Sequence, residues 1–261
     1  MHPTPPLITG QQGPLDALVV GASGGIGLAL ARALAAHPGV ARLFPTSRQA
    51  PASGPLADLA TDHPGVVHPL TLDLTDDDSL AGLTQRLREA QARPQLVINC
   101  AGLLHGPGLR PEKSLAALRR DALAQAFAVN AIGPVLLAQA VAPLLRHRLP
   151  AVFASLSARV GSIGDNRLGG WYAYRAAKAA QNQLLKTFSI ELQRLNPQAC
   201  CLLLHPGTVD TELSRPFQGS VARERLFSAD TAAGHLLAVI AAATPADNGR
   251  FIAWDGRDIA W

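Results

Sequence analysis

The sequence predicts a single α/β domain, a doubly wound parallel sheet of about seven strands with helices on both faces. Short apolar runs alternate with longer helix-like segments from Leu15 to the end of the chain, which is the pattern of a parallel sheet covered on both sides. A glycine-rich stretch separates the first apolar run from the first helix-like segment. The chain has 261 residues, of which 48% are hydrophobic, so it can bury one large core.

The predicted elements follow this alternation in chain order. Strands are expected at residues 15–20, 40–46, 66–72, 95–100, 151–156, 199–204 and 249–253. Helices are expected at residues 26–36, 79–92, 115–128, 134–146, 172–195 and 231–243. Residues 1–14 are polar and proline-rich and are expected to form a short tail. No repeat or low-complexity linker divides residues 15–261, so one domain is expected there.

The turn after the first strand carries Gly21, Gly25 and Gly27, whose spacing differs from the common G-x-G-x-x-G fingerprint. Glycines at these places let the backbone turn sharply and approach a ligand closely. The unpaired amides at the start of the following helix, together with its dipole, favour a bound pyrophosphate. An ordinary strand-to-helix turn can carry the same glycines, so this motif alone leaves both interpretations open.

Ligands of such sheets bind beyond the carboxyl ends of the strands. Polar or glycine-rich segments follow five of the predicted strands, at residues 46–48, 73–76, 99–102, 155–159 and 205–211. Each segment by itself is compatible with a simple turn. Their recurrence at five strand ends favours a binding crevice there.

Tyr174 and Lys178 are four residues apart on a predicted helix and therefore share one of its faces. A neighbouring ammonium favours the phenolate and is expected to lower the pKa of Tyr174. Tyr174 is then a candidate general acid or base near neutral pH. The alternative is a half-buried tyrosine and a solvated lysine on an amphipathic helix.

Asn130 lies just before Gly133 and Pro134 in an otherwise continuous helical pattern. Glycine followed by proline at a first helical turn predicts a break at this point. A plain helix end is the alternative.

Taken together, these motifs resemble the short-chain dehydrogenase/reductase family, in order and in approximate spacing, over nearly the whole chain. The segments at residues 157–166, 171–175, 205–213 and 251–256 resemble the C-factor and sniffer-like carbonyl reductase branch of that family. The resemblance implies a Rossmann-type fold. It also implies an oxidoreductase that moves a hydride between a nicotinamide cofactor and a carbonyl or alcohol.

The resemblance also implies roles for individual residues. Tyr174 is expected to exchange a proton with the substrate oxygen, Lys178 to bind the nicotinamide ribose, and Asn130 to hold a water that links the lysine to solvent. Cofactor contacts are implied for Gly21, Ser23, Gly25, Ile26, Gly27, Asp73, Leu74, Asn99, Ala101, Gly102, Pro206, Gly207, Val209 and Thr211, besides Tyr174 and Lys178. For Asp73, capping of the following helix is an alternative.

One position departs from the family pattern. The family usually has Ser-Ser-x-x-Gly after the fifth strand, with the second serine polarising the substrate carbonyl, whereas this chain has Ala158 there. Ser157 is the expected replacement, with Ser155 and Ser162 as alternatives. A shift of one residue along an extended segment turns a side chain to the other face. The path of this loop therefore decides whether the Ser157 hydroxyl reaches the substrate.

Arg48 predicts the choice of cofactor. An acidic residue at the end of the second strand receives the ribose hydroxyls of NAD, whereas an arginine accommodates the additional phosphate of NADP. Ser47 and Arg48 stand at this place, and the next acidic residue is Asp58. NADPH is therefore expected to bind more tightly than NADH, unless Arg48 points into solvent.

The charge and cysteine patterns exclude other classes of protein. The formal charge of +4 arises from basic residues scattered singly or in pairs, so a nucleic-acid surface is not expected. No run reaches the ~18 consecutive apolar residues of a membrane span, and a signal-peptide pattern is lacking, so a cytoplasmic protein without membrane contact is expected. Cys200 and Cys201 should face opposite sides of a strand, and with Cys100 they predict neither a disulfide framework nor a metal site.

Two further expectations concern the substrate and the assembly. Residues 212–228 are expected to cover the substrate, and their apolar members favour a carbonyl compound with some hydrophobic body; these are Leu213, Pro216, Phe217, Leu226 and Phe227. Helix 172–195 carries more apolar positions than covering the sheet requires, namely Leu184, Leu185, Phe188 and Leu192. A homodimer or homotetramer formed through this helix and segment 134–145 is expected.

An alternative function of a different class is a nucleotide-sensing or signalling protein whose fold serves partner binding, as the association of C-factor with intercellular signalling suggests. The missing serine at Ala158 supports this alternative. The retained Tyr174, Lys178 and Asn130 favour the enzyme, because a pure binding module does not need them.

Overall fold

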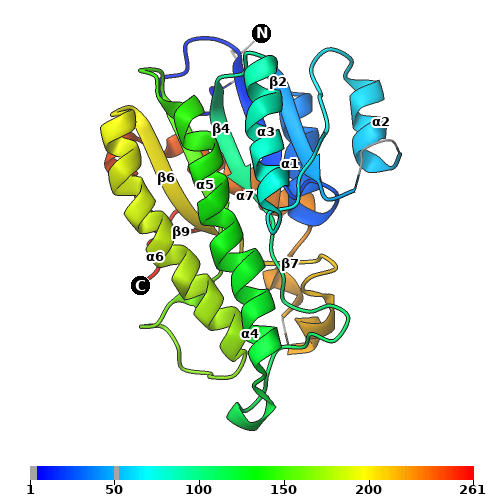
Figure 1. The fold of residues 1–261 in the computed structure, drawn as a ribbon. Helices are drawn as coiled ribbons and strands as arrows, with labels where there is room; N and C mark the ends of the chain where they lie inside the picture. Colours follow the sequence, from blue (N-terminus) through cyan, green and yellow to red (C-terminus); the bar gives the residue numbers. More distant parts are fainter. Residues whose placement is uncertain (1–4, 50–52, 221) are drawn as a thin grey trace.

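The computed structural model describes residues 5–49, 53–220 and 222–261. Its centre is a seven-stranded sheet in the order β3-β2-β1-β4-β5-β6-β9, in which every neighbouring pair is parallel (Figure 1). The strands are β1 Leu15–Val20, β2 Val40–Ser47, β3 Leu70–Thr71, β4 Pro94–Asn99, β5 Ala151–Leu156, β6 Ala199–His205 and β9 Arg250–Ala253. The predicted fold class is confirmed. Since β1 and β4 are adjacent, the strand order reverses between them, and a crevice forms at such a reversal.

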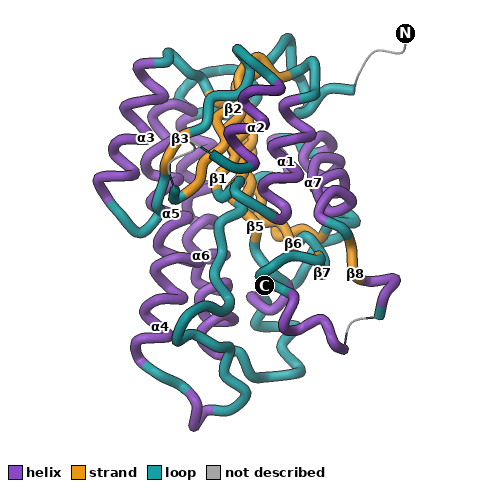
Figure 2. Tube along the Cα trace, turned by 90° about the vertical axis from the view of Figure 1, so that its right-hand side faces the viewer, coloured by secondary structure: helices purple, strands orange, loops and turns teal. Residues whose placement is uncertain are grey.

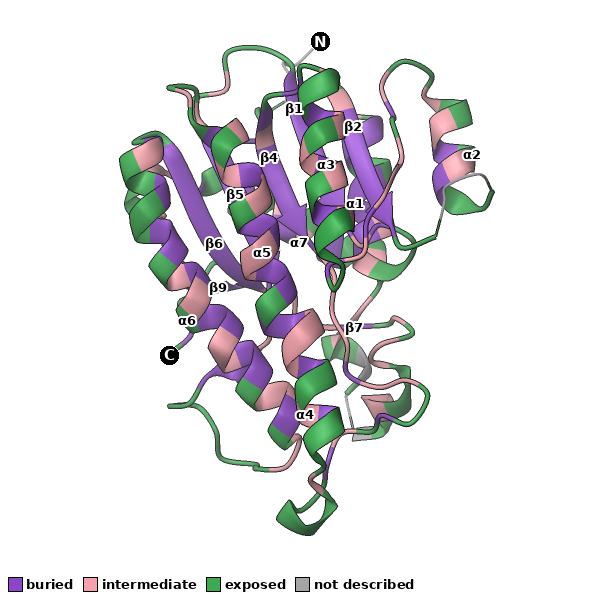
Figure 3. Cartoon of the chain, in the orientation of Figure 1, coloured by how far each residue is buried: buried purple, intermediate pink, exposed green. Residues whose placement is uncertain are grey.

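Helices cover both faces of the sheet, as the side view shows (Figure 2). One face is covered by α1 Gly25–Ala35 and α7 Ala229–Ala242, the other by α3 Asp77–Glu89, α5 Gly133–Val141 and α6 Tyr172–Leu195. The central strands are buried on both faces, whereas the outer helix faces are exposed (Figure 3). Cys200 and Cys201 belong to the two opposite hydrophobic clusters, as their alternation in a strand requires.

Several predicted boundaries were wrong. The third strand is confined to Leu70–Thr71, and an isolated bridge between Leu43 and Val67 is all the pairing found in the earlier part of the predicted segment. Helix α2, Pro55–Asp62, was not predicted. The predicted helix 115–128 is a 3₁₀ turn at Leu115–Ala117 followed by α4 Arg120–Phe127. Further 3₁₀ turns lie at Ala142–Leu145, Arg159–Gly161, Arg215–Ser220, Arg223–Arg225 and Pro245–Asp247, and a two-stranded parallel pair joins β7 Thr208–Val209 to β8 Leu226–Phe227.

The N-terminal segment is not a free tail over its described part, residues 5–14. Leu7 and Ile8 are buried in the core cluster beside α1 and α7. The Thr9 hydroxyl donates to the carbonyl oxygen of Ala241 in α7 at 3.0 Å. Gln11 donates to the carbonyl oxygen of Gly39 at 2.8 Å. Two apolar side chains within a polar segment are enough to dock it.

The predicted break at Gly133 and Pro134 is absent, because the chain continues from α4 to α5 through a π turn at Ala128–Ile132. Pro134 lies in the first turn of α5, where the missing backbone N–H of a proline costs no hydrogen bond within the helix. The resulting run Arg120–Leu145 is long and apolar enough, by length and composition, to cross a membrane. It packs partly buried against α3 and α6, and core helices of soluble proteins pass the same test.

Candidate active site

The glycine-rich turn brings the first helix tightly against the first strand. Gly21 has a φ of 77°, and a Cβ atom built on it would lie 2.9 Å from the amide nitrogen of Ala101. A Cβ on Gly27 would lie 2.2 Å from the carbonyl oxygen of Gly21. No side chain caps the N-terminus of α1, and its first turn contains no acidic residue. The helix therefore presents backbone donors and the positive end of its dipole to the adjoining space.

That space is a hollow of about 550 Å³, which we call the first hollow. The sequence-predicted residues in its lining are Gly21, Ser23, Gly25, Ile26, Gly27, Arg48, Ala101, Gly102, Ser157, Tyr174, Lys178, Pro206 and Thr211. They come from the ends of β1, β2, β4, β5 and β6 and from α6. The predicted crevice beyond the strand ends is thus present, and its lining fits a phosphate-bearing dinucleotide.

Two predicted cofactor contacts, Asn99 and Leu74, and the predicted water-binding residue Asn130 lie behind the lining of the site. The amide of Asn99 donates to the Ser155 hydroxyl at 3.0 Å, and its oxygen accepts from the Ala101 backbone nitrogen at 3.2 Å. Leu74 is buried against Gly133. A Cβ atom built on Gly133 would lie 2.9 Å from the Cβ atom of Leu74. Asn130, which is fully buried, accepts from the backbone nitrogen of Leu103 at 2.8 Å and donates to the carbonyl oxygen of Leu103 at 2.7 Å.

Arg48 and Asp73 border a side hollow of about 770 Å³, together with the hydroxyl residues Ser23, Ser47 and Ser53. Hydrogen bonds from the backbone and the hydroxyl of Thr75 lower the pKa of Asp73, and the charge of Arg48 lowers it further. Asp73 does not cap α3. The cap is Asp76, which accepts from the backbone nitrogens of Asp78 and Ser79 at 3.0 and 3.3 Å.

Tyr174 and Lys178 share the face of α6 that meets the first hollow. The Lys178 ammonium lies 5.9 Å from the centroid of the tyrosine ring. It donates to the carbonyl oxygen of Leu156 and to the side-chain oxygen of Gln181, both at 2.8 Å. The alternative of a solvated lysine is wrong, because Lys178 is only 2% exposed.

Burial shifts the pKa values of this pair in directions that sequence reasoning did not predict. It lowers the pKa of Lys178 to about 7 and raises the pKa of Tyr174 above its ordinary value. The expected lowering of the tyrosine pKa was therefore wrong for this state of the site. The free-energy cost of removing the phenolate from water exceeds the stabilisation that the neighbouring ammonium gives it, because burial also disfavours the charged form of the lysine.

Gln181 is a buried residue of the site that sequence reasoning missed. Its amide donates to the Ser155 hydroxyl at 2.8 Å and to the carbonyl oxygen of Leu156 at 3.2 Å, while its oxygen accepts from Lys178. The network joins α6 to the ends of β4 and β5 through Asn99. A glutamine three residues after the lysine, on the same helix face, was the available signal.

Of the three candidate serines, Ser157 is the one found in the described lining of the hollows. It lines them together with Tyr174, and its hydroxyl donates to the side-chain oxygen of Asn182 at 2.6 Å. Ser155 accepts the two buried amides described above, and Ser162 accepts from the backbone nitrogen of Asp165 at 3.0 Å. Ala158 also borders the active-site space.

A second hollow of about 540 Å³ adjoins the first. Six residues line both of them: Ile26, Ser157, Tyr174, Pro206, Thr211 and Leu213. The predicted cofactor residues Gly207 and Val209 line the second hollow. Of the predicted covering segment, Leu213 and Phe217 contribute to its wall, and Phe217 contacts Trp171 edge to face with ring centroids 5.0 Å apart.

His205, at the end of β6, is a second residue of the hollows that was not singled out. Its Nδ1 atom is buried without a hydrogen-bond partner in the described structure. Burial lowers its pKa to about 4, so the imidazole is neutral at pH 7. Only its position directly after a strand distinguished it in the sequence.

A family model described as short chain dehydrogenase matches residues 16–220. The chain belongs to the short-chain dehydrogenase family. A 1-hydroxy-2-glutathionyl-2-methyl-3-butene dehydrogenase of Rhodococcus sp. (strain AD45) is 34% identical over 209 residues, which cover 78% of this chain and 84% of the relative. The C-signal protein of Myxococcus xanthus is 33% identical over 140 residues, 53% of this chain and 78% of the relative.

Solved structures agree with this assignment. The NADPH-bound carbonyl reductase from chicken fatty liver superposes with a TM-score of 0.83 at 28% identity, covering 95% of this chain and 100% of the other. The carbonyl reductase Sniffer of D. melanogaster has a TM-score of 0.82 at 29% identity and covers 96% and 100% of the two chains. These likenesses support the sniffer-like branch of short-chain dehydrogenases. The chain is an NAD(P)-dependent oxidoreductase of this family.

Proposed function

We propose that the protein is a carbonyl reductase that transfers a hydride between NADP(H) and a carbonyl or alcohol, with Tyr174 as the general acid or base. The observation that carries this proposal is the meeting of the two hollows at Tyr174 and Ser157. The first hollow has the glycine turn and helix N-terminus suited to a dinucleotide, and the second is largely apolar. A bound nicotinamide supplies the hydride.

The residues of the chain supply the binding and the proton. The turn at Gly21–Gly27 would hold the cofactor phosphates, and Pro206 and Thr211 would adjoin its nicotinamide end. Because burial raises its pKa, Tyr174 is a neutral phenol at pH 7, which is the form that donates a proton to a reduced carbonyl oxygen. Lys178, with a pKa of about 7, can exchange protons with neighbouring groups at neutral pH. Ser157 would hydrogen-bond the substrate oxygen, and Gln181 would position Lys178.

The test uses the two tyrosines of the chain, Tyr172 and Tyr174. Purified protein is assayed for NADPH oxidation with a panel of aldehydes, ketones and quinones. Tyr174→Phe should lower kcat by about 10²-fold or more, since general acid–base catalysis contributes that much, and should change the NADPH dissociation constant far less. Tyr172→Phe, on the same helix and 39% exposed, is the matched control and should keep its activity. Full activity of Tyr174→Phe contradicts the proposal.

The preference for NADPH rests on Arg48, which borders both the first hollow and the side hollow of serine hydroxyls. A guanidinium can bond the additional phosphate through several donors. The NADP-bound short-chain dehydrogenase/reductase structure from Burkholderia multivorans, with a TM-score of 0.78 at 26% identity, also supports an NADP-type cofactor.

A nucleotide-binding signalling role is the second candidate, favoured by Ala158 and by the likeness to C-signal. In that case the protein binds NADPH but turns over no substrate of the panel. Restoring the hydroxyl with Ala158→Ser separates the two candidates. An enzyme that uses Ser157 gains little from this change, whereas a protein limited by the missing serine gains turnover.

Assembly into a homodimer or homotetramer remains our proposal, but fewer apolar side chains are available for the interface than the sequence indicated. Leu185, Phe188 and Leu192 are buried in the core, so they are not free to pack against a second molecule. The apolar surface left on α6 includes Ile190, which is 51% exposed, and Ile132, at the end of the π turn before α5, is 48% exposed. Light scattering at micromolar concentration tests the proposal, and a monomeric mass rules it out.

A further inference from the structure

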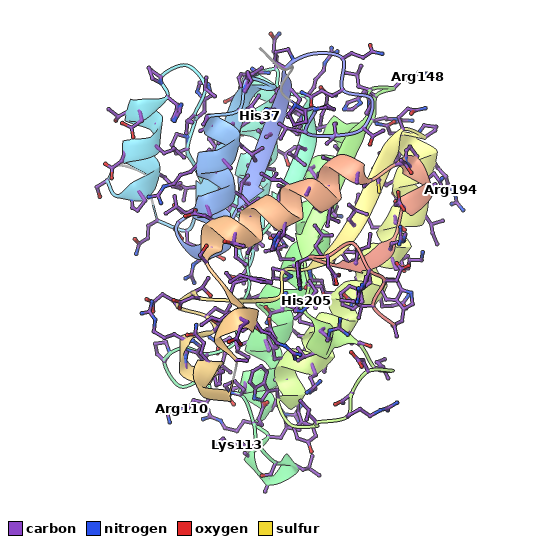
Figure 4. The ribbon with its side chains drawn as sticks, turned by 180° about the vertical axis from the view of Figure 1, so that it is seen from behind. His37, Arg110, Lys113, Arg148, Arg194 and His205 are labelled. Carbon is purple, nitrogen blue, oxygen red and sulfur yellow. The ribbon has the colours of Figure 1, made fainter. Side chains whose placement is uncertain are left out.

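The second hollow is basic as well as apolar. Its described lining contains Arg159 and Arg175, besides the neutral His205, but no aspartate or glutamate. The whole chain is nearly balanced, with 23 arginines and lysines against 19 acidic residues, so composition alone does not produce a lining of one sign. Figure 4 shows His205 in the middle of the molecule, between the sheet and the segments that extend beyond its strand ends.

Arg175 carries a charge that the described structure does not neutralise. It follows Tyr174 in the first turn of α6, where the helix dipole disfavours a cation. Its guanidinium donates to the carbonyl oxygens of Gly170, Val160 and Gly169 at 3.0, 3.4 and 3.2 Å. Within the described residues it forms no ion pair with a carboxylate. An anion beside it gains from both the guanidinium and the helix end.

The carboxylate of Glu112 accepts a hydrogen bond at the same end of α6. Glu112 is buried, and its Oε2 accepts from the backbone nitrogen of Ala173 at 3.2 Å. It is not part of the described lining of the second hollow. It therefore caps a backbone donor of α6 from outside the hollow, and the described charges that line the hollow itself are those of Arg159 and Arg175.

Arg159 is the second cation, on the loop after β5. It pairs with Asp165 at 2.9 Å, but the two side chains are 54% and 41% exposed. Such an exposed pair is weak, because solvent screens it, and it occupies a single donor of the guanidinium. Arg159 can therefore engage a ligand carboxylate. Its charge also acts on His205, whose pKa is lowered first by burial and then by this arginine, while Asp255 raises it.

We infer that the second hollow selects carbonyl or alcohol substrates that carry a carboxylate on an apolar body. The carboxylate would lie against Arg159 and Arg175, the apolar body against Trp171 and Phe217, and the reacting oxygen at Tyr174. A hollow of about 540 Å³ is of the size that encloses a small organic molecule. This inference rests on the proposed function, because it assigns the substrate class of the same site.

The experiment compares 4-formylbenzoate with its methyl ester, using NADPH and the whole protein. We expect kcat/KM for the acid to exceed that for the ester by ~10-fold or more, the effect of hydrogen bonds to a charged group. Arg159→Gln should remove most of this preference, lowering kcat/KM for the acid ~10-fold more than kcat/KM for the ester. Arg215→Gln is the matched control, because Arg215 pairs with Glu212 and is not in the described lining of the hollow. Equal kcat/KM values for acid and ester overturn the inference.

A binding measurement keeps the inference testable if neither compound is reduced, and the panel of aldehydes, ketones and quinones then decides separately whether the proposed function has failed. Calorimetric titration of the NADP-loaded protein compares 4-methylbenzoate with 4-methylbenzamide, which has the same shape without the charge. Binding of the acid ~10-fold more tightly, lost in Arg159→Gln, supports an anion site that is independent of turnover. Equal affinities for the two compounds overturn it.

Discussion

Replacing Lys178 by methionine tests whether the fold desolvates this lysine as the structure indicates. Methionine keeps an unbranched apolar stem but removes the titrating group. Burial lowers the lysine pKa from 10.5 to about 7 in the folded protein. Between these two values the unfolded chain binds more protons at this residue than the folded protein does. The free energy of unfolding must therefore rise with pH across this window, and the contribution is lost as the pH falls towards 7.

The magnitude follows from the two pKa values. From pH 7 to pH 8.5 the lysine adds about 1.5 kcal/mol to the stability of the natural protein, at a limiting slope of about 1.4 kcal/mol per pH unit. The window ends there because burial raises the pKa values of Cys100 and Cys200 to about 12, so these thiols oppose folding at higher pH. The contribution of His205 to stability also increases with pH, starting from its folded pKa of about 4. This increase is nearly complete by pH 7.

Urea unfolding at both pH values, without cofactor, measures the effect. The natural protein should gain about 1.5 kcal/mol over the window, and Lys178→Met should gain almost none. The variant is also expected to be less stable at both pH values, because Leu156 and Gln181 lose their buried donor. Lys186→Met, at a partly exposed position of the same helix, should behave as the natural protein. Parallel pH dependence in the natural protein and Lys178→Met would refute the reasoning.

Three further predictions concern the cofactor site and the frame of the sheet. Arg48→Ala should lose most of a ~10- to 100-fold preference for NADPH over NADH, while its affinity for NADH stays nearly constant. Titration of both cofactors against both proteins measures this preference. Equal affinities of the natural protein for the two cofactors would contradict the role of Arg48. Gly27→Ala places a Cβ atom 2.2 Å from the Gly21 carbonyl oxygen. NADPH affinity should therefore fall by ~10-fold or more, and the free energy of unfolding should fall by ~1–3 kcal/mol. Unchanged NADPH affinity in a titration would argue against a tight turn at Gly21–Gly27. Asp16→Asn weakens a partly buried bidentate pair with Arg42, at 2.6 and 2.9 Å, and should cost ~1–3 kcal/mol in urea unfolding. A cost below ~0.5 kcal/mol would make the pair irrelevant to stability.

The sequence alone determined the fold class and most of the candidate site. Strand and helix alternation is a local property of apolar periodicity, and it placed the central strands to within about two residues. Because the carboxyl ends of parallel strands lie at one edge, the chemistry-bearing segments after them could be assigned to one crevice without coordinates. This is why Gly21, Ser157 and Tyr174 were expected together, and the structure places all three in the lining of the first hollow.

Only the tertiary structure decided the electrostatic state of the site and the path of the chain where local signals conflict. The Gly133–Pro134 pair indicates a break, yet packing against α3 and α6 holds the helix together through a π turn. The spacing of Tyr174 and Lys178 places them on one face but does not show how much water they retain. That depends on strands and loops far away in the sequence, and desolvation by these neighbours outweighs the attraction that spacing suggested. Ser157 was likewise distinguishable from Ser155 only when partners from distant elements, Asn99 and Gln181, were in place.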